Sequence, residues 1–151
     1  MTEERKCNLC GRSVMNGNGA NSHIMTESSN SKRAINIPGS KLYRTDGKNV
    51  MDANKQLKHN GLLCRDCDSR LGTWEGERSR LFGKILSRDD FDETGMRLTS
   101  GYKQDYIVAA CLADVFRASV TNRDAFSGVS LGVKHELRIK EILNGFLRDL
   151  N

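Results

Sequence analysis

The sequence predicts an α+β fold in which a small cysteine-braced core with a β-hairpin is followed by a helical C-terminal part. Two Cys-x-x-Cys units, which begin at Cys7 and Cys64, are expected to join the start of the chain to its middle. Short segments separated by turn residues fill the first half, whereas apolar residues at three- and four-residue spacings dominate the end. We therefore expect a core over residues 1–88, with an inserted loop over 25–60, and a helical subdomain over 89–151 that packs on it.

The first 60 residues are predicted to form short strands and loops. Asn, Gly and Ser are frequent here, and they tolerate the unusual backbone angles of turns. The expected elements are two short strands around the Cys7–Cys10 turn, a polar loop at 16–21, strands at 34–37 and 41–44 joined by Pro38-Gly39, and an extended stretch or weak hairpin at 48–58.

Helices are predicted after the second cysteine pair and in the last third of the chain. Asp66 or Asp68 is expected to cap the first helix, and Trp74 to be a core residue that covers the cysteine site. Cys111 lies on the apolar stripe of the second helix, where a free cysteine behaves as a small buried hydrophobe. The two later helices, expected at 102–120 and 131–150 after an acidic connector at 89–100, can pair with the helix that follows Cys67.

Net charge is +5, and it is concentrated in the first part of the chain. Residues 1–88 hold 16 Lys and Arg against 9 Asp and Glu, whereas residues 89–151 hold 8 against 10. A basic N-terminal half is compatible with a phosphate-bearing partner, and equally with a generic solvated basic surface.

No apolar run approaches the length of a membrane-spanning helix, and the N-terminus lacks the apolar region of a secretory signal. We therefore expect a cytoplasmic protein. In a reducing compartment, paired cysteines are more often metal ligands than disulfides, and the odd total of five argues against a disulfide framework.

The two cysteine pairs predict one structural zinc site made by Cys7, Cys10, Cys64 and Cys67. Each Cys-x-x-Cys turn directs two sulfurs to one spot, and two turns supply the four thiolates of a tetrahedral site. Such a site has no open coordination position, so any catalysis must come from a second site. The alternative is redox pairs or free thiols, but the βαβ context typical of redox pairs is absent around Cys7.

Around these cysteines the chain resembles the HNH (treble-clef, ββα-metal) endonuclease-like zinc proteins of bacteria and phages. The resemblance rests on Cys7-x-x-Cys10-Gly11, Ser22-His23-Ile24, Leu62-Leu63-Cys64-x-x-Cys67, Leu71-Gly72 and Glu75. It implies a treble-clef core, with His23 as general base on a water that attacks a phosphodiester. It also implies that Asp68 helps to hold a Mg²⁺ or Mn²⁺ ion.

The match departs from the family pattern at three points. Ser22 stands where an active nuclease carries a metal-ligating acid, Met25 stands where a Pro is common, and the middle Asn has only Asn49 or Asn54 as candidates. The alternative for His23 is a buried histidine that packs against the zinc turns. His59 is expected in a polar loop and His135 on the surface of the last helix.

Basic residues near the core are the expected contacts for a phosphate backbone. The resemblance implies that the helix after Cys67 and the strands before it face DNA, which singles out Arg44, Lys48, Arg65 and Arg70. The alternative is that Arg65, Arg70 and Arg78 pair with Asp66, Glu75 and Glu77 on the helix surface.

Two functions follow. The first is a zinc-stabilised, HNH-like DNA-associated protein, with metal-dependent endonuclease activity through His23 as the catalytic expectation. The second is a non-catalytic phage or bacterial accessory protein that uses the same scaffold to bind a host protein, such as a polymerase or a defence complex. Ser22 favours the second function and the basic N-terminal half favours the first.

Overall fold

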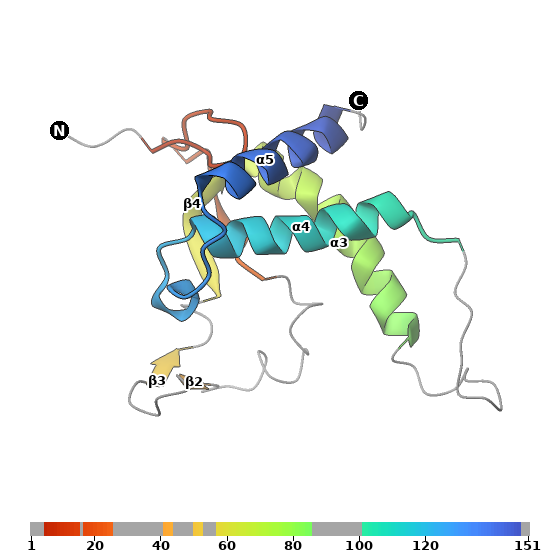
Figure 1. Cartoon of the computed structure of the whole chain (residues 1–151), viewed down its shortest axis with the longest axis horizontal. Helices are drawn as coiled ribbons and strands as arrows, with labels where there is room; N and C mark the ends of the chain where they lie inside the picture. The colour runs from red at the N-terminus through yellow and green to blue at the C-terminus, as the bar shows by residue number, and fades with distance from the viewer. Residues whose placement is uncertain are drawn as a thin grey trace.

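The computed structural model describes residues 5–15, 17–25, 57–85 and 101–148, and the backbone of 41–43 and 50–52. Three helices dominate it: α3 (Arg65–Ile85), α4 (Gln104–Val120) and α5 (Val133–Arg148), with α4 packed against both of the others (Figure 1). A 3-10 turn, η2 (Asp124–Phe126), lies in the connection between α4 and α5. The helices agree with the predicted ones to within two residues at each predicted end.

Four short strands form two antiparallel pairs. Strand β1 (Gly19–His23) pairs with β4 (Lys58–Cys64), and β2 (Lys41–Tyr43) pairs with β3 (Val50–Asp52). The strand expected at 41–44 is present as β2, but it pairs with β3, in the stretch where a weak hairpin was expected at 48–58. The partner strand expected at 34–37 lies outside the described residues. Because β1 pairs with β4, the chain leaves and re-enters the core at one place, and β4 then runs directly into α3.

The main core joins the start of the chain to all three helices. It contains the buried side chains of Leu9, Leu71, Phe116 and Leu143 together with Trp74, which is fully buried. The Trp74 ring meets the ring of Phe146 edge-on at 5.9 Å between centroids. The prediction that Trp74 is a core residue is therefore confirmed. Burial of a large apolar side chain of this kind stabilises a fold by about 1.5–3 kcal/mol.

A smaller apolar cluster holds the β1–β4 pair against the end of α4. It contains Ile24 from the residue after β1, Leu57 and Leu62 from β4 and its approach, and Ala118 and Phe126 from α4 and η2. The β1–β4 pair is thereby attached to the helices at both ends: β4 continues into α3 at one end, and this cluster packs against α4 and η2 at the other.

The apolar stripe predicted for α4 is buried only in part: Phe116 lies in the core and Leu112 packs against it, but other members of the stripe do not. Small residues, Ala109, Ala110 and Ala113, face the core, whereas Val108 and Val115 are 46% and 42% exposed. Cys111 is also exposed, so the expectation that it is buried is wrong. The side of α4 that faces α3 and α5 is therefore formed by these alanines together with Phe116.

His59 is likewise not in a polar loop: it lies half-buried in β4, whereas His135 is exposed on α5 as expected. Within the described residues, no helix combines the length and the apolar character needed to cross a bilayer.

A pair of glycine substitutions tests this backbone. Gly61 in β4 has a φ of 78°, a left-handed conformation, so Gly61→Ala is expected to destabilise the protein by roughly 1–2 kcal/mol. Gly72 is a helical residue of α3 whose added Cβ would meet nothing within 4 Å, so Gly72→Ala is expected to stabilise by about 0.5–1 kcal/mol. Urea unfolding curves measure both, and equal signs for the two changes would contradict the assigned backbone.

Candidate metal centre

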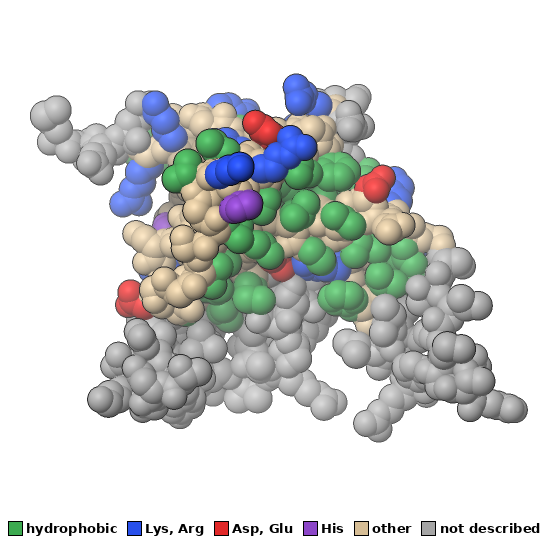
Figure 2. All heavy atoms as spheres, viewed as in Figure 1, with side chains coloured by type: hydrophobic (Ala, Val, Ile, Leu, Met, Phe, Trp, Pro, Cys, Tyr) green, Lys and Arg blue, Asp and Glu red, His purple; other side chains and the backbone are tan. Residues whose placement is uncertain are grey.

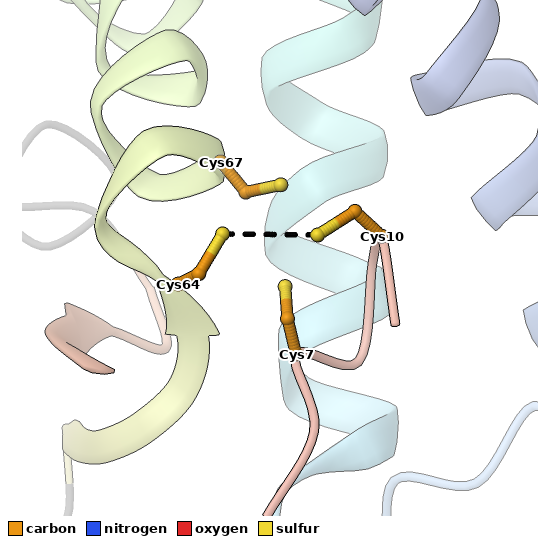
Figure 3. Close-up of side chains that lie close together, drawn as sticks. All are labelled: Cys7, Cys10, Cys64 and Cys67. Atoms are coloured by element: carbon orange, nitrogen blue, oxygen red, sulfur yellow. Dashed lines mark hydrogen bonds between the residues drawn. The ribbon is translucent and has the colours of Figure 1, made fainter. Parts of the chain in front are cut away.

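Four cysteine sulfurs meet at the junction between the N-terminal segment, β4 and α3. The Sγ atoms of Cys7, Cys10, Cys64 and Cys67 all lie within 4.8 Å of one another. Figure 3 shows the four side chains pointing at a common centre, two from the N-terminal turn and two from the strand–helix junction. Three of the four residues are buried and Cys10 is half-buried. The structure therefore brings together all four predicted ligands.

The first pair sits on a tight turn closed by backbone hydrogen bonds. A β-bridge between Lys6 and Ser13 brackets the turn. Inside it, the Cys7 N–H donates to the Arg12 carbonyl at 2.8 Å, and the Gly11 N–H donates to the Cys7 carbonyl at 2.9 Å. Gly11 has a φ of 77°, which glycine adopts without steric cost. The turn thus presents both sulfurs on the same side.

The second pair spans the end of a strand and the start of a helix. Cys64 is the last residue of β4, and Cys67 lies in the first turn of α3. The Arg65 N–H, at the start of that helix, donates to the Asn18 carbonyl at 3.0 Å. The strand–helix junction thus presents both sulfurs toward the first cysteine turn (Figure 3).

Two asparagines fix the first turn to the rest of the core. Asn8 donates to the Leu62 carbonyl twice, from its backbone N–H at 3.2 Å and from its side chain at 2.9 Å. The Asn144 side chain, from α5, donates to the Leu9 carbonyl at 3.1 Å. These contacts hold the turn in register with β4 and place α5 beside it.

The thiols influence one another's ionisation strongly. A hydrogen bond from Cys67, aided by neighbouring backbone N–H groups and opposed by burial, lowers the pKa of Cys7 to about 4. The same hydrogen bond raises the pKa of Cys67, and burial raises the pKa of Cys64. Without a cation the cluster therefore carries one readily formed thiolate. A divalent cation at the centre would displace the remaining thiol protons.

Arg12 links the two cysteine pairs on the outer side of the cluster. Its Nε donates to the Cys10 sulfur at 3.3 Å, and its guanidinium forms an ion pair with Asp66 in the first turn of α3. The Cys10 sulfur and then the Asp66 carboxylate raise the pKa of Arg12, so it stays a cation. A positive charge beside Cys10 partly offsets the negative charge that four thiolates would accumulate.

The donor set limits the kind of ion that the site can take. Four thiolate sulfurs are soft ligands, which suit ions such as zinc and do not suit Mg²⁺ or Ca²⁺. The cluster can therefore hold a metal ion such as zinc, with protein sulfur at every position of a tetrahedral shell.

The two predicted catalytic residues lie on two different elements. His23 is the half-buried last residue of β1, and Asp68 is half-buried in the first turn of α3. Among the described residues, the four cysteines are the one group of three or more His, Cys, Asp or Glu that can hold a metal ion. Ser22 is fully buried, and its hydroxyl has no hydrogen-bond partner among the residues that the structure describes. Asn49 and Asn54 lie outside the described residues.

The predicted DNA-facing residues are placed only in part. Arg44 and Lys48 lie outside the described residues. Arg65 is exposed at the start of α3, and Arg70 is half-buried one turn later. Arg70 lines an open pocket of about 450 Å³ beside Cys10, together with Arg12, Asp66, Glu141 and Arg148. Three arginines against two carboxylates leave that pocket with a slight excess of positive charge.

The expected surface pairs along α3 are mostly wrong. Asp66 pairs with Arg12, and Glu77 pairs with Arg80 at 2.8 Å, while Glu75 and Arg78 turn inward toward α4.

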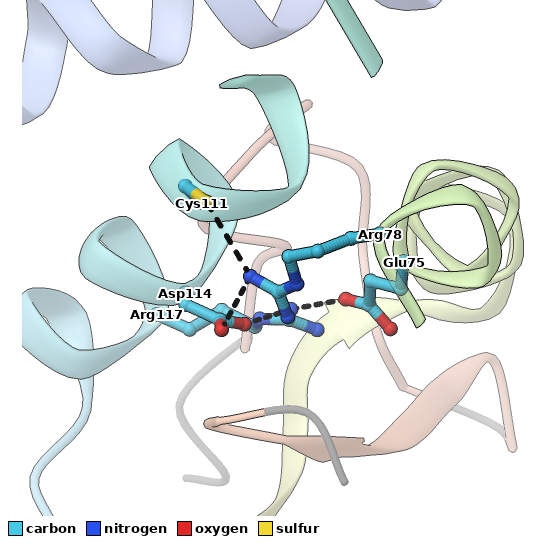
Figure 4. Close-up of polar contacts among 5 residues, drawn as sticks. All are labelled: Glu75, Arg78, Cys111, Asp114 and Arg117. Atoms are coloured by element: carbon cyan, nitrogen blue, oxygen red, sulfur yellow. Dashed lines mark hydrogen bonds and ion pairs between the residues drawn. The ribbon is translucent and has the colours of Figure 1, made fainter. Parts of the chain in front are cut away.

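A buried ion-pair network, missed from the sequence, connects α3 to α4 (Figure 4). Asp114 lies between two arginines: one carboxylate oxygen is 2.9 Å from Arg78 and the other is 2.9 Å from Arg117. Arg117 also pairs with Glu75. Arg78 and Arg117 are only 2% and 1% exposed, so each needs its carboxylate partners. Burial raises the pKa of Glu75, while Arg117 opposes that shift.

A signal for this network was present in the sequence. Asp114 and Arg117 flank Phe116 at helical spacing, within the apolar stretch of α4, and Glu75 and Arg78 repeat the i, i+3 pattern on α3. Opposite charges on an inward-facing helix stripe indicate buried pairing with a neighbouring helix.

Searches of protein-family models, curated proteins and solved structures found no significant match to this chain. Its function must therefore be inferred from its own residues.

Proposed function

We propose that this chain is a zinc-stabilised, HNH-like protein that associates with DNA. The observation that carries the proposal is the convergence of the Cys7, Cys10, Cys64 and Cys67 sulfurs within 4.8 Å. In this proposal the ion is zinc and its role is structural, because four protein sulfurs leave no coordination position for water or substrate.

The order of elements around the cysteines supports an HNH-like, treble-clef core. A cysteine turn bracketed by the Lys6–Ser13 bridge comes first, the β1–β4 pair follows, and the last cysteine opens α3. This is the sequence of parts that the resemblance implies: a turn, a β-pair and a helix that share one zinc ion. His23 ends β1, and the resemblance implies that it is the general base.

Association with DNA is supported by charge. The first 88 residues carry most of the positive charge, and Arg65 and Arg70 lie at the start of α3. Cutting would require a second, hard ion such as Mg²⁺ or Mn²⁺, held in part by Asp68, while His23 removes a proton from the attacking water.

A nicking assay tests the catalytic part of this proposal. Wild-type protein with Mg²⁺ or Mn²⁺ is expected to convert supercoiled plasmid to the open circle. His23→Ala is expected to lower the rate by about 10²-fold or more, because a general base contributes about 10²–10⁴. The matched control is His135→Ala, which removes an exposed histidine from α5.

The conclusion from that assay depends on the difference between the two variants. Equal residual nicking by wild type, His23→Ala and His135→Ala would indicate a contaminating nuclease. It would contradict the proposal that this protein is an endonuclease with His23 as its general base. Salt-dependent DNA binding without nicking would leave a DNA-binding protein.

A second function, docking to another protein, is favoured by exposed apolar side chains on the helices. Val133 and Leu137 on α5 are 73% and 54% exposed, and Val108 and Val115 on α4 also face outward. Figure 2 shows apolar side chains gathered on the face formed by α4. Isolated exposed apolar residues are common, but an accumulation on one face is typical of an interaction surface. This alternative predicts neither nicking nor salt-dependent binding of DNA.

A further inference from the structure

Among the four clustered cysteines, Cys10 is the most exposed. Cys7, Cys64 and Cys67 are 1%, 0% and 2% exposed, whereas Cys10 is half-buried. Cys10 also lines the open pocket of about 450 Å³ between the first cysteine turn, α3 and α5. A small solute that enters this pocket therefore meets Cys10 more readily than the other three cysteines.

The surroundings of the Cys10 sulfur are positively charged. Arg12 Nε donates to this sulfur at 3.3 Å, and Arg12 is one of three arginines that line the pocket, against two carboxylates. Reactive cysteines are typically partly exposed and lie beside cations, because the thiolate and not the thiol is the nucleophile. A cysteine that binds a metal ion is also deprotonated. Cys10 is therefore placed to react with an electrophile as a thiolate.

The sulfur of Cys64 lies beside that of Cys10. The two Sγ atoms are 3.7 Å apart, and Figure 3 shows the two side chains pointing at each other from opposite halves of the cluster. Cys10 belongs to the N-terminal turn and Cys64 ends β4. A disulfide has a sulfur–sulfur distance of about 2.05 Å, so the two side chains need only a short further approach to form one.

We propose that Cys10 is an oxidation site for hydrogen peroxide, and that formation of a Cys10–Cys64 disulfide there releases the bound zinc ion. This inference rests on the zinc site of the proposed function and adds a regulation to it: the metal content of the protein depends on the oxidant. The two observations that carry it are the open pocket at Cys10 and the contact between the two sulfurs.

The reaction has two steps. The Cys10 thiolate attacks one oxygen of hydrogen peroxide, the O–O bond breaks, and Cys10 becomes a sulfenic acid while hydroxide leaves. The Cys64 thiolate then attacks the Cys10 sulfur, the S–O bond breaks, and a second hydroxide leaves. Each hydroxide takes a proton from solvent, so two thiolates lose two electrons and hydrogen peroxide is reduced to two water molecules.

The product can no longer hold zinc tightly. Zinc binds cysteine as the thiolate, and a disulfide sulfur carries no negative charge. Only Cys7 and Cys67 keep thiolate sulfurs after the reaction, which leaves two of the four ligands. Because the disulfide is reversible, a thiol reductant together with zinc is expected to restore the original site.

Limited oxidation of zinc-loaded wild-type protein tests this proposal. One equivalent of hydrogen peroxide is expected to release about one zinc ion per chain to a chromogenic chelator. Peptide mass spectrometry after alkylation of the remaining thiols is expected to find the Cys10–Cys64 disulfide. The matched control is Cys111→Ser, which removes the exposed cysteine outside the cluster and should release zinc at the wild-type rate.

The pairing of the sulfurs decides the outcome. Zinc release with a Cys10–Cys64 disulfide, reversed by dithiothreitol and zinc, supports the proposal. A disulfide of Cys7 with Cys10 or Cys67, or loss of zinc release in Cys111→Ser, overturns it. Retained zinc with all four thiols unmodified overturns the oxidation site and leaves the structural zinc intact. Wild-type protein that holds no zinc before oxidation contradicts the zinc site itself, and with it this regulation.

A second measurement identifies the cysteine that reacts first. A reagent that traps sulfenic acids, added during brief exposure to hydrogen peroxide, is expected to label Cys10 and to prevent the disulfide. Labelling of Cys64 in place of Cys10 would overturn the proposed order of the two steps. Both measurements use the wild-type protein, so neither depends on the folding of a variant that lacks a ligand cysteine.

Discussion

Replacing Cys64 with serine is expected to unfold the core of this protein and to abolish tight zinc binding. Cys64 is fully buried, ends β4 and supplies one of four converging sulfurs. Structural zinc sites have apparent binding free energies of about 10–16 kcal/mol, which equals or exceeds the usual stability of about 5–15 kcal/mol for a whole domain. The apolar cluster that includes Leu9, Trp74 and Leu143 also contains the ligand cysteines, so loss of the ion removes a support from all three helices.

Elemental analysis and thermal melting measure this prediction together. Wild-type protein is expected to carry one zinc per chain and to lose its cooperative transition when a chelator removes the ion. Cys111→Ser is the matched control, because Cys111 is exposed and outside the cluster; it should keep both the zinc and the transition. A metal-free wild type with a sharp transition would contradict a structural ion.

Replacing Asp114 with alanine is expected to destabilise the protein by about 3–5 kcal/mol. Asp114 is the carboxylate shared by Arg78 and Arg117, and both arginines are almost completely buried. Removal of one member of a buried ion network leaves charge without compensation, and this penalty exceeds the loss of any single hydrogen bond. Because the arginines come from α3 and α4, the expected consequence is a weaker contact between these helices.

Urea unfolding curves for Asp114→Ala and Glu77→Gln test whether burial is the cause. Glu77 pairs with Arg80 on the surface of α3, where the arginine is half exposed to solvent, so its loss should change the urea midpoint little. A double change, Arg78→Met with Asp114→Leu, should recover part of the lost stability, since apolar residues remove the uncompensated charge. Equal midpoints for Asp114→Ala and Glu77→Gln would show that the network contributes no more than a surface pair.

The parts of the structure that depend on local signals were predictable. Cys-x-x-Cys spacing indicated which four sulfurs converge, because each turn fixes two of them within a few residues. Helical periodicity located α3, α4 and α5, and the strand at 41–44 was expected, but its pairing with 50–52 was not predicted.

Which side of each helix is buried was not predictable in the same way. The apolar stripe predicted for α4 included Val108 and Val115, which are exposed, whereas its alanines face the core together with Phe116. His59 was assigned to a polar loop, yet it lies in β4, where its ring is hydrogen-bonded to Thr121, a residue distant in the sequence.

The sequence by itself therefore determined the metal-ligand set and the order of helices, since both arise from neighbours along the chain. Only the tertiary structure decided that Arg78 and Arg117 share Asp114 in the interior, and that the His59 ring meets Thr121 at the end of α4. The physical reason is range: turn geometry and helical period act over a few residues. The burial and pairing of a charged side chain depend on partners that folding brings together from far along the chain, such as Glu75 and Arg117, which are 42 residues apart.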